Sequence, residues 1–170
     1  TNVTAATIDY AKSASSANGG ITAANTKSLT ITGADAVTTG VITAVNIETV
    51  SATAAKALSV GDIDSDEANK LTTVNLTSTT EGVTAAVIGS TTNTETLNVT
   101  INAAKDIAQT GAINSTKVGN ISATSTAGKV TLGTIGANAT TMGDVTVNAK
   151  GNATSGTIGT VVANIKTLGT

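Results

Sequence analysis

The densest group of side chains able to do chemistry is an acidic segment in the first half of the chain. Asp62, Asp64, Asp66 and Glu67 lie within residues 61–67. Carboxylates at alternate positions of a tight turn can converge on a hard cation such as calcium. The segment is not an EF-hand loop, because its sixth position holds Glu67 instead of glycine and its twelfth holds Thr73 instead of glutamate. We therefore predict a calcium site at these four acidic residues; the alternative is a solvated acidic turn without metal.

Other groups suited to catalysis are scarce. The chain contains no His and no Cys. A general base near neutrality or an activated nucleophile would therefore have to be a lysine or a carboxylate. The one dense acidic cluster lies within residues 61–67, and no second carboxylate pair stands at a spacing typical of glycosidases. The sequence predicts that the protein is not an enzyme.

Composition also narrows the partners and the compartment. The formal net charge is −2, and aromatic residues make up 1% of the chain. A nucleic-acid partner is not expected, because binding needs a basic face and stacking aromatics. No apolar run is long enough to span a bilayer. A Cys-free acidic chain rich in Thr, Ala, Asn and Gly is typical of bacterial surface proteins, so we expect an extracellular location at the cell surface.

The elements that would position these groups show a repeat. An asparagine between small or aliphatic residues recurs along the chain at uneven intervals that average about 24 residues, a period at which self-similarity indicates a repeat fold. The Gly-Thr-Ile-Gly sequence at Gly133 recurs at Gly156, an interval that agrees with this period. The recurring asparagines are Asn46, Asn75, Asn98, Asn120, Asn148 and Asn164.

The segments around the repeat alternate as strands do. Leu29 and Ile31 alternate with Thr30 and Thr32, which gives one aliphatic face and one hydroxyl face. Without large aromatics the core must be narrow, as in stacked coils. An antiparallel sandwich would favour Asn-Gly or Asp-Gly hairpin turns between alternating strands, which are lacking. The sequence predicts an all-β, right-handed parallel β-helix (β-solenoid) of about 23 residues per coil, with the asparagines aligned on its outside or at its corners.

The expected organisation has two parts. Residues 1–26 are predicted to be an N-terminal cap or linker, because Ala5 to Ala17 has a loose helical spacing that ends at Gly19-Gly20; a short helix and an irregular cap are both open. Residues 27–170 are predicted to form the β-solenoid, as a fragment of a longer protein. The acidic segment at 61–67 falls in the longest asparagine interval and is predicted to bulge from the stack as an insertion.

The chain resembles the β-helical region of bacterial S-layer proteins exported by type I secretion in Campylobacter and Caulobacter relatives. The resemblance rests on the Thr/Ala/Asn/Gly composition without Cys and on runs at residues 70–77 and 95–99. It implies a structural cell-surface protein that self-assembles with copies of itself into a lattice, with calcium at contacts and, through another domain, attachment to cell-surface polysaccharide. Calcium is carried over only to Asp62, Asp64, Asp66 and Glu67.

Two other functions are compatible with parts of the sequence. An adhesin or hemagglutinin-type passenger stalk that binds other cells is the main alternative. An ice-binding array is less favoured, because Thr-x-Thr pairs such as Thr30-Ile31-Thr32 do not recur at a constant interval and Glu95 interrupts one of them.

Overall fold

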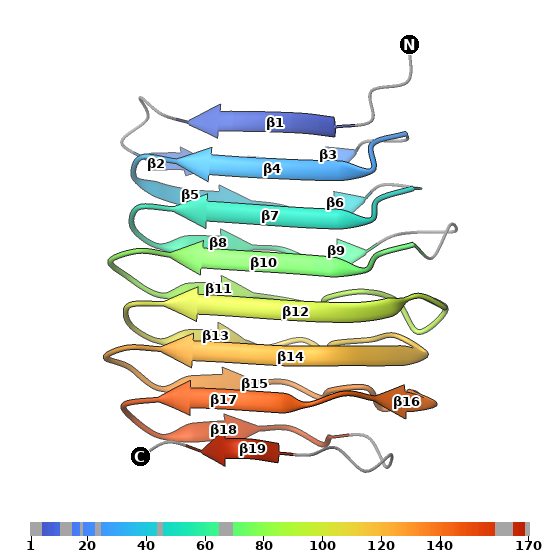
Figure 1. Ribbon diagram of the computed structural model, residues 1–170. Coiled ribbons are helices and arrows are strands. Elements are labelled where there is room, and N and C mark those ends of the chain that lie inside the picture. The colour runs from blue at the N-terminus through green and yellow to red at the C-terminus, as the bar shows by residue number, and fades with distance from the viewer. Residues whose placement is uncertain are drawn as a thin grey trace.

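The computed structural model describes residues 5–10, 15–17, 19–22, 25–43, 46–64, 70–158 and 165–168. Within these ranges the regular structure is entirely β, without a helix. Coils stack along one axis, so the two ends of the chain lie at opposite ends of the stack (Figure 1). The prediction of a parallel β-solenoid is confirmed.

Three parallel sheets form the walls of the solenoid. In the described residues sheet A has nine strands, sheet B seven and sheet C three. Sheet A consists of β1 Ala5–Tyr10, β4 Ser28–Gly33, β7 Thr49–Ala54, β10 Thr73–Ser78, β12 Thr96–Ala103, β14 Lys117–Ser125, β17 Val145–Ala149 and β19 Ile165–Leu168, with β16 Thr141–Met142 beside β14.

The other two sheets are narrower. Sheet B consists of β2 Ser15–Ala17, β5 Ala36–Thr39, β8 Leu58–Val60, β11 Val83–Ala85, β13 Ile107–Gln109, β15 Val130–Leu132 and β18 Ala153–Ser155, and sheet C of β3 Ile21–Thr22, β6 Ile42–Thr43 and β9 Ile63–Asp64. In Figure 1 the strands of sheet A run leftward at the front and those of sheet B return rightward behind them as the chain descends. That path is a right-handed coil, as predicted.

A column of isoleucines marks the period of the coil. Sheet C strands pair at Ile21, Ile42 and Ile63, and single bridges extend the column. The bridges join Ile63, Ile88, Ile113, Ile135 and Ile158. Successive members are about 23 residues apart on average, which is the coil length that the repeat predicts. The interior members are at most 1% exposed, so this column is one wall of the core.

Sheet A supplies the widest wall. Inward positions stack in register, as in Leu29 on Val50 and Val50 on Val74, whereas the residues between them face outward. In the next inward column the small side chain of Ala52 lies between the large side chains of Ile31 and Leu76, which keeps the filled volume even along the core. Because each coil buries only a few aliphatic side chains per wall, the interior is filled without aromatic rings.

The asparagine motif does not form one column, contrary to the prediction. Asn75 pairs with Thr100, and Asn148 pairs with Thr124, so these two amides lie in different outward columns. Asn98 pairs with Thr73 in a third column. The intervals between Asn75, Asn98, Asn120 and Asn148 therefore approximate the coil length only because each of these residues lies somewhere on a sheet A strand.

Of the two possibilities left open for the N-terminal part, the helix is wrong for the described residues. Ala5–Tyr10 is strand β1, and it pairs with β4 in parallel from Ala5 opposite Ser28 to Tyr10 opposite Gly33. Ile8 and Tyr10 pack against the core from this strand. Strands β2 and β3 likewise pair with β5 and β6, so strands before residue 27 belong to the same three sheets as those after it.

The isoleucine column generates a stability prediction. Ile113→Ala should lower the free energy of unfolding by about 2–4 kcal/mol, because it removes a fully buried side chain and leaves a cavity between Ile88 and Ile135. Thermal or urea unfolding followed by circular dichroism measures the change. The control Thr84→Ala, at an exposed site on sheet B, should shift stability by no more than about 0.5 kcal/mol. Equal losses in the two variants would contradict the core assignment.

Candidate functional site

The acidic segment begins inside the coil. Ile63 is fully buried in the isoleucine column, so residues 61–64 are part of the regular rung and the predicted insertion is wrong for them. The Asp62 carboxylate accepts a hydrogen bond from the backbone N–H of Val87 in the next coil at 3.0 Å. Asp64 ends strand β9. Asp66 and Glu67 lie outside the described residues, so only the first part of the predicted calcium site is placed in the fold.

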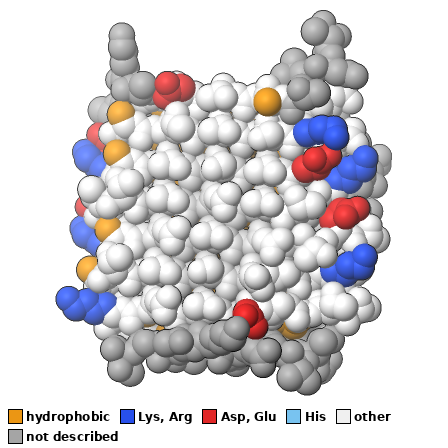
Figure 2. Space-filling model, viewed as in Figure 1, with side chains coloured by type: hydrophobic (Ala, Val, Ile, Leu, Met, Phe, Trp, Pro, Cys, Tyr) orange, Lys and Arg blue, Asp and Glu red, His pale blue; other side chains and the backbone are white. Residues whose placement is uncertain are grey.

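The feature that dominates the described surface is the outer face of sheet A. Its outward positions form three columns of Thr, Ser and Asn; two of them run from β4 to β17, and the third runs from β4 to Asn120 in β14, beside Asp144. The central column runs through Thr30, Ser51, Asn75, Thr100, Ser122 and Thr146, and the column beside it through Thr32, Thr53, Thr77, Asn102, Thr124 and Asn148. Apart from Lys117 at the start of β14, the sheet A strands from β4 to β17 contain no charged residue. Figure 2 shows the middle of this face without charged side chains, with acidic side chains near its upper and lower edges.

The third column contains a hydrogen-bonded stack of side chains. The Asn98 Oδ1 accepts the backbone N–H of Asn120 at 2.9 Å, and the Asn120 Oδ1 accepts the backbone N–H of Asp144 at 3.0 Å. The stack lies where the register between β12 and β14 shifts, between Leu97 and Val99. The amides therefore satisfy backbone donors that the shift removes from the ladder.

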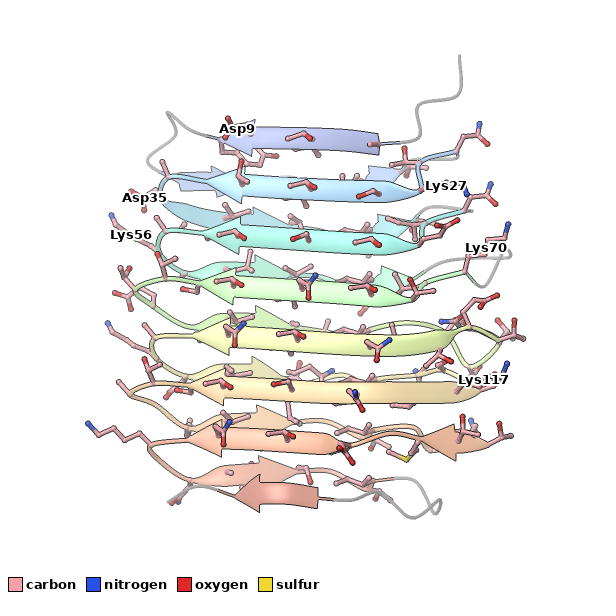
Figure 3. The ribbon with its side chains drawn as sticks, in the orientation of Figure 1. Asp9, Lys27, Asp35, Lys56, Lys70 and Lys117 are labelled. Atoms are coloured by element: carbon pink, nitrogen blue, oxygen red, sulfur yellow. The ribbon has the colours of Figure 1, made fainter. Side chains whose placement is uncertain are left out.

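Charged side chains gather along both sides of this face (Figures 2 and 3). We call the residues before or at the start of sheet A strands the entry rim and those after the strands the exit rim. The entry rim consists of Lys27, Glu48, Lys70, Glu95 and Lys117. The exit rim contains Asp35, Lys56, Glu81 and Lys105, with Asp106 next to Lys105, and continues through Lys129 and Lys150. The sign of the charge alternates from one coil to the next down the entry rim, and down the exit rim from Asp35 to Lys105.

Adjacent coils are joined by ion pairs along the rims. On the entry rim, Lys27 Nζ lies 2.8 Å from Glu48 Oε1. On the exit rim, Lys56 Nζ lies 2.9 Å from Asp35 Oδ2, and Lys105 Nζ lies 2.6 Å from Glu81 Oε2. The lysine side chains are 56–58% exposed in all three pairs, so each pair contributes little to stability but leaves an ammonium group accessible.

Buried hydroxyls hold the exit rim in place. The Ser78 hydroxyl donates to the carbonyl of Lys56 at 2.6 Å and accepts the N–H of Glu81 at 3.2 Å. Ser125 makes the same type of bond to the carbonyl of Lys105 at 2.6 Å. These serines occupy a small-residue column at the corner between sheets A and B, where Ser78 lies beside Ala54 and Ala103. The backbone of the rim is thereby fixed even though its charged side chains are in solvent.

A buried amide does the same for the entry rim. Asn93 is fully buried; its Nδ2 donates to the carbonyl of Leu71 at 2.8 Å, and its Oδ1 accepts the N–H of Glu95 at 3.1 Å. The Ser115 hydroxyl donates to the carbonyl of Glu95 and accepts the N–H of Lys117. The backbone that carries these rim charges is thus positioned by polar side chains inside the corner.

The rim contacts perturb two carboxyl groups. The hydrogen bond from the Lys56 ammonium, with a second from the backbone N–H of Ala36, lowers the pKa of Asp35. The hydrogen bond from Lys27 lowers the pKa of Glu48, and the positive charge of Lys70 adds to the effect. Both groups favour the charged form at neutral pH, so the alternation of charge is present there.

Two shallow grooves lie beside the rims. A shallow groove of about 290 Å³ lies along the entry rim between Glu48, Lys70, Thr72 and Glu95. Another of about 190 Å³ lies beside the exit rim, lined in part by Ser78, Asn102 and Thr124. Both are below the usual size of an enclosed ligand site.

The fold and this surface define a parallel β-solenoid with one broad uncharged face. Comparison with protein-family models, curated proteins and solved structures finds no match. Among the described residues no helix has the length and apolar character needed to cross a membrane.

Sequence reasoning missed two signals that were present. The first is the column of isoleucines such as Ile63 and Ile88, whose recurrence marks the coil more faithfully than asparagine does. The second is the alternation of lysine with acidic residues at nearly the same spacing, as in Lys27 and Glu48. Residues one coil apart are neighbours in a solenoid, so that spacing would have paired them.

The calcium site stays a prediction with a direct test. Isothermal titration of calcium into the protein should release or absorb heat, and calcium should raise the unfolding temperature, because carboxylates bind the hard cation. Asp64→Ala should abolish both effects, whereas Asp144→Ala, an acidic residue outside the segment, should leave them unchanged. No heat and no thermal shift in the unaltered protein would contradict the prediction.

The rim ion pairs predict a pKa change. Lys56→Met should raise the pKa of Asp35, because the variant loses the ammonium hydrogen bond that stabilises the carboxylate. The stability that Asp35 contributes is present above its unfolded pKa and is lost as pH falls through the lowered folded pKa, so the variant should lose less stability on acidification. A carboxyl-detected NMR titration measures the shift. Lys150→Met is the control, and an unchanged Asp35 pKa in Lys56→Met would refute the assignment.

Proposed function

We propose that this chain is a structural, non-catalytic element of a bacterial cell surface that assembles with copies of itself into a surface layer. The observation that carries the proposal is the broad sheet A face without charge, bounded by charged rims. The extracellular location rests on the Cys-free, Thr-rich composition.

The shape of the stack supports a structural role. The core is one continuous aliphatic cluster from Leu29 to Ala149, and the two grooves beside the rims are shallow. Backbone hydrogen bonds join each coil to the next, for example Ile88 N to Ala112 O and Ile113 N to Thr134 O. A stack of this kind is rigid and transmits load, since each coil is supported by its neighbours on both sides.

The surface of sheet A supports packing against other molecules. Burying Thr, Ser and Asn costs less than burying charges, and their hydroxyls and amides can exchange water for a partner's polar groups. Strands of a sheet stand about 4.8 Å apart, so the three columns repeat at that spacing. The columns mix threonine with serine and asparagine, which favours packing over the single repeated side chain that an ice-binding array would use.

Electron microscopy tests the proposal. The protein, concentrated at neutral pH and adsorbed to a flat support, should form ordered two-dimensional arrays, because copies with the same surface can repeat a contact without limit. Imaging of the native cell surface should show a lattice. Isolated fibres on the cell surface would contradict the lattice and favour the adhesin stalk, and the two outcomes are told apart in one image.

A further inference from the structure

At each of four coils the entry rim and the exit rim carry charges of opposite sign, and the ion pairs within one chain do not require this relation. Four consecutive strands of sheet A are flanked by charges of opposite sign, and the order reverses at each coil. The flanking pairs are Lys27 and Asp35 at β4, Glu48 and Lys56 at β7, Lys70 and Glu81 at β10, and Glu95 and Lys105 at β12. At β14 the corresponding exit position is Gly128, whose carbonyl accepts the N–H of Gly151, and the adjacent Lys129 has the same sign as Lys117, so the pattern covers four coils.

Stability of the single chain explains only part of this pattern. Alternation down one rim is accounted for by ion pairs between adjacent coils, such as Lys27 with Glu48. The entry and exit rims, however, are separated by the length of a sheet A strand, about 20 Å at the usual rise per residue. That distance exceeds the Debye length of about 8–10 Å at moderate ionic strength, so the charges of one rim do not sense those of the other. The opposite signs of the two rims at each of these coils therefore do not stabilise the single chain, but they can stabilise a contact with another molecule.

From this phase relation we infer that copies of the chain associate side by side, with the entry rim of one copy against the exit rim of the next. This inference rests on the proposed self-assembly, and it identifies the rims as the surfaces through which the copies associate. Moving one copy sideways by its own width, without rotation, brings rims of opposite sign to the same level in four coils. Lys27 then faces Asp35 of the neighbour, and Glu48 faces Lys56 of the neighbour.

The geometry of the rims suits this contact. Lys27 and Lys70 lie at one side of sheet A and Asp35 and Lys56 at the other, with their ends directed away from the stack (Figure 3). The lysine side chains in the ion pairs are more than half exposed, so each can reach a second carboxylate without leaving the first. Two alternating columns in contact form a checkerboard in which every charge has opposite neighbours above, below and beside it.

The symmetry of the contact has a structural consequence. An entry rim against an exit rim is a head-to-tail contact, which does not close on itself when the copies are related by translation. Rows of any length result, and every copy presents sheet A on the same side of the row. A row of this kind has one continuous uncharged face.

Inverting one whole rim tests the contact. The exit-rim variant combines Asp35→Lys, Lys56→Glu, Glu81→Lys and Lys105→Glu, which keeps the net charge and retains both ion pairs in reversed form. It should self-associate on the order of tenfold more weakly or worse, because like charges then meet at every level. Sedimentation velocity over a range of protein concentrations measures the association. Circular dichroism and thermal unfolding check the fold, since Asp35 also accepts the N–H of Ala36.

A second inversion provides the matched control. The entry-rim variant combines Lys27→Glu, Glu48→Lys, Lys70→Glu and Glu95→Lys, and it should also associate weakly alone. Mixing the two variants should restore association, because each inverted rim meets an inverted rim and each native rim meets a native one. In the native protein, association should weaken as salt rises from about 0.05 M to about 0.5 M.

The outcomes separate this inference from the proposed function. If the exit-rim variant forms arrays as the native protein does, the rim contact is overturned and self-assembly stands. If the native protein assembles but the mixture of variants does not regain association, the rim contact is likewise overturned. If the native protein stays monomeric at all concentrations, both proposals fail.

Discussion

The parallel register of the stacked coils is the constraint on which the rest of the structure depends. Inward positions must meet aliphatic residues above and below, and a slip of one residue would turn every aliphatic side chain outward. Leu29, Val50 and Val74 follow one another for this reason. Once the register is fixed from inside, the outer residues are also fixed in columns about 4.8 Å apart. Any residue type repeated at the coil length thereby becomes a linear array on the surface.

Register is kept although the coils differ in length. The isoleucines of the column are unevenly spaced in the sequence, since Ile63 is closer to Ile42 than to Ile88, yet β7 and β10 pair along their whole length without a break. The differences in length fall outside the paired sheet A strands, and at two corners Ser78 and Asn93 hold the backbone with side-chain hydrogen bonds. An irregular interval in the sequence is therefore compatible with regular spacing in the structure.

The fold could be predicted because it depends on local patterns. The alternation in Leu29-Thr30-Ile31-Thr32 indicates a strand with one buried and one exposed face. The lack of large aromatic residues indicates a narrow core. The alanine spacing of the first residues leaves a short helix and an irregular cap both open, and it hides the alternation of Ala6, Ile8 and Tyr10 that pairing with β4 reveals. The candidate surface could not be assigned from spacing alone, since asparagines with similar intervals lie in three different columns.

Charge on such a surface is governed by the same stacking. Like charges about 4.8 Å apart along a column would repel one another at every step, so a column is tolerated when it is neutral or when its signs alternate. The sheet A face adopts the first solution and the rims adopt the second, with Lys56 on Asp35 as one example. A neutral column presents similar side chains at every coil, so it does little to fix how far one molecule is shifted along the stack relative to its neighbour. An alternating column has a phase, and a neighbour displaced by one coil meets like charges throughout. The rims are therefore the part of this surface able to select one alignment between molecules, while the neutral face tolerates many.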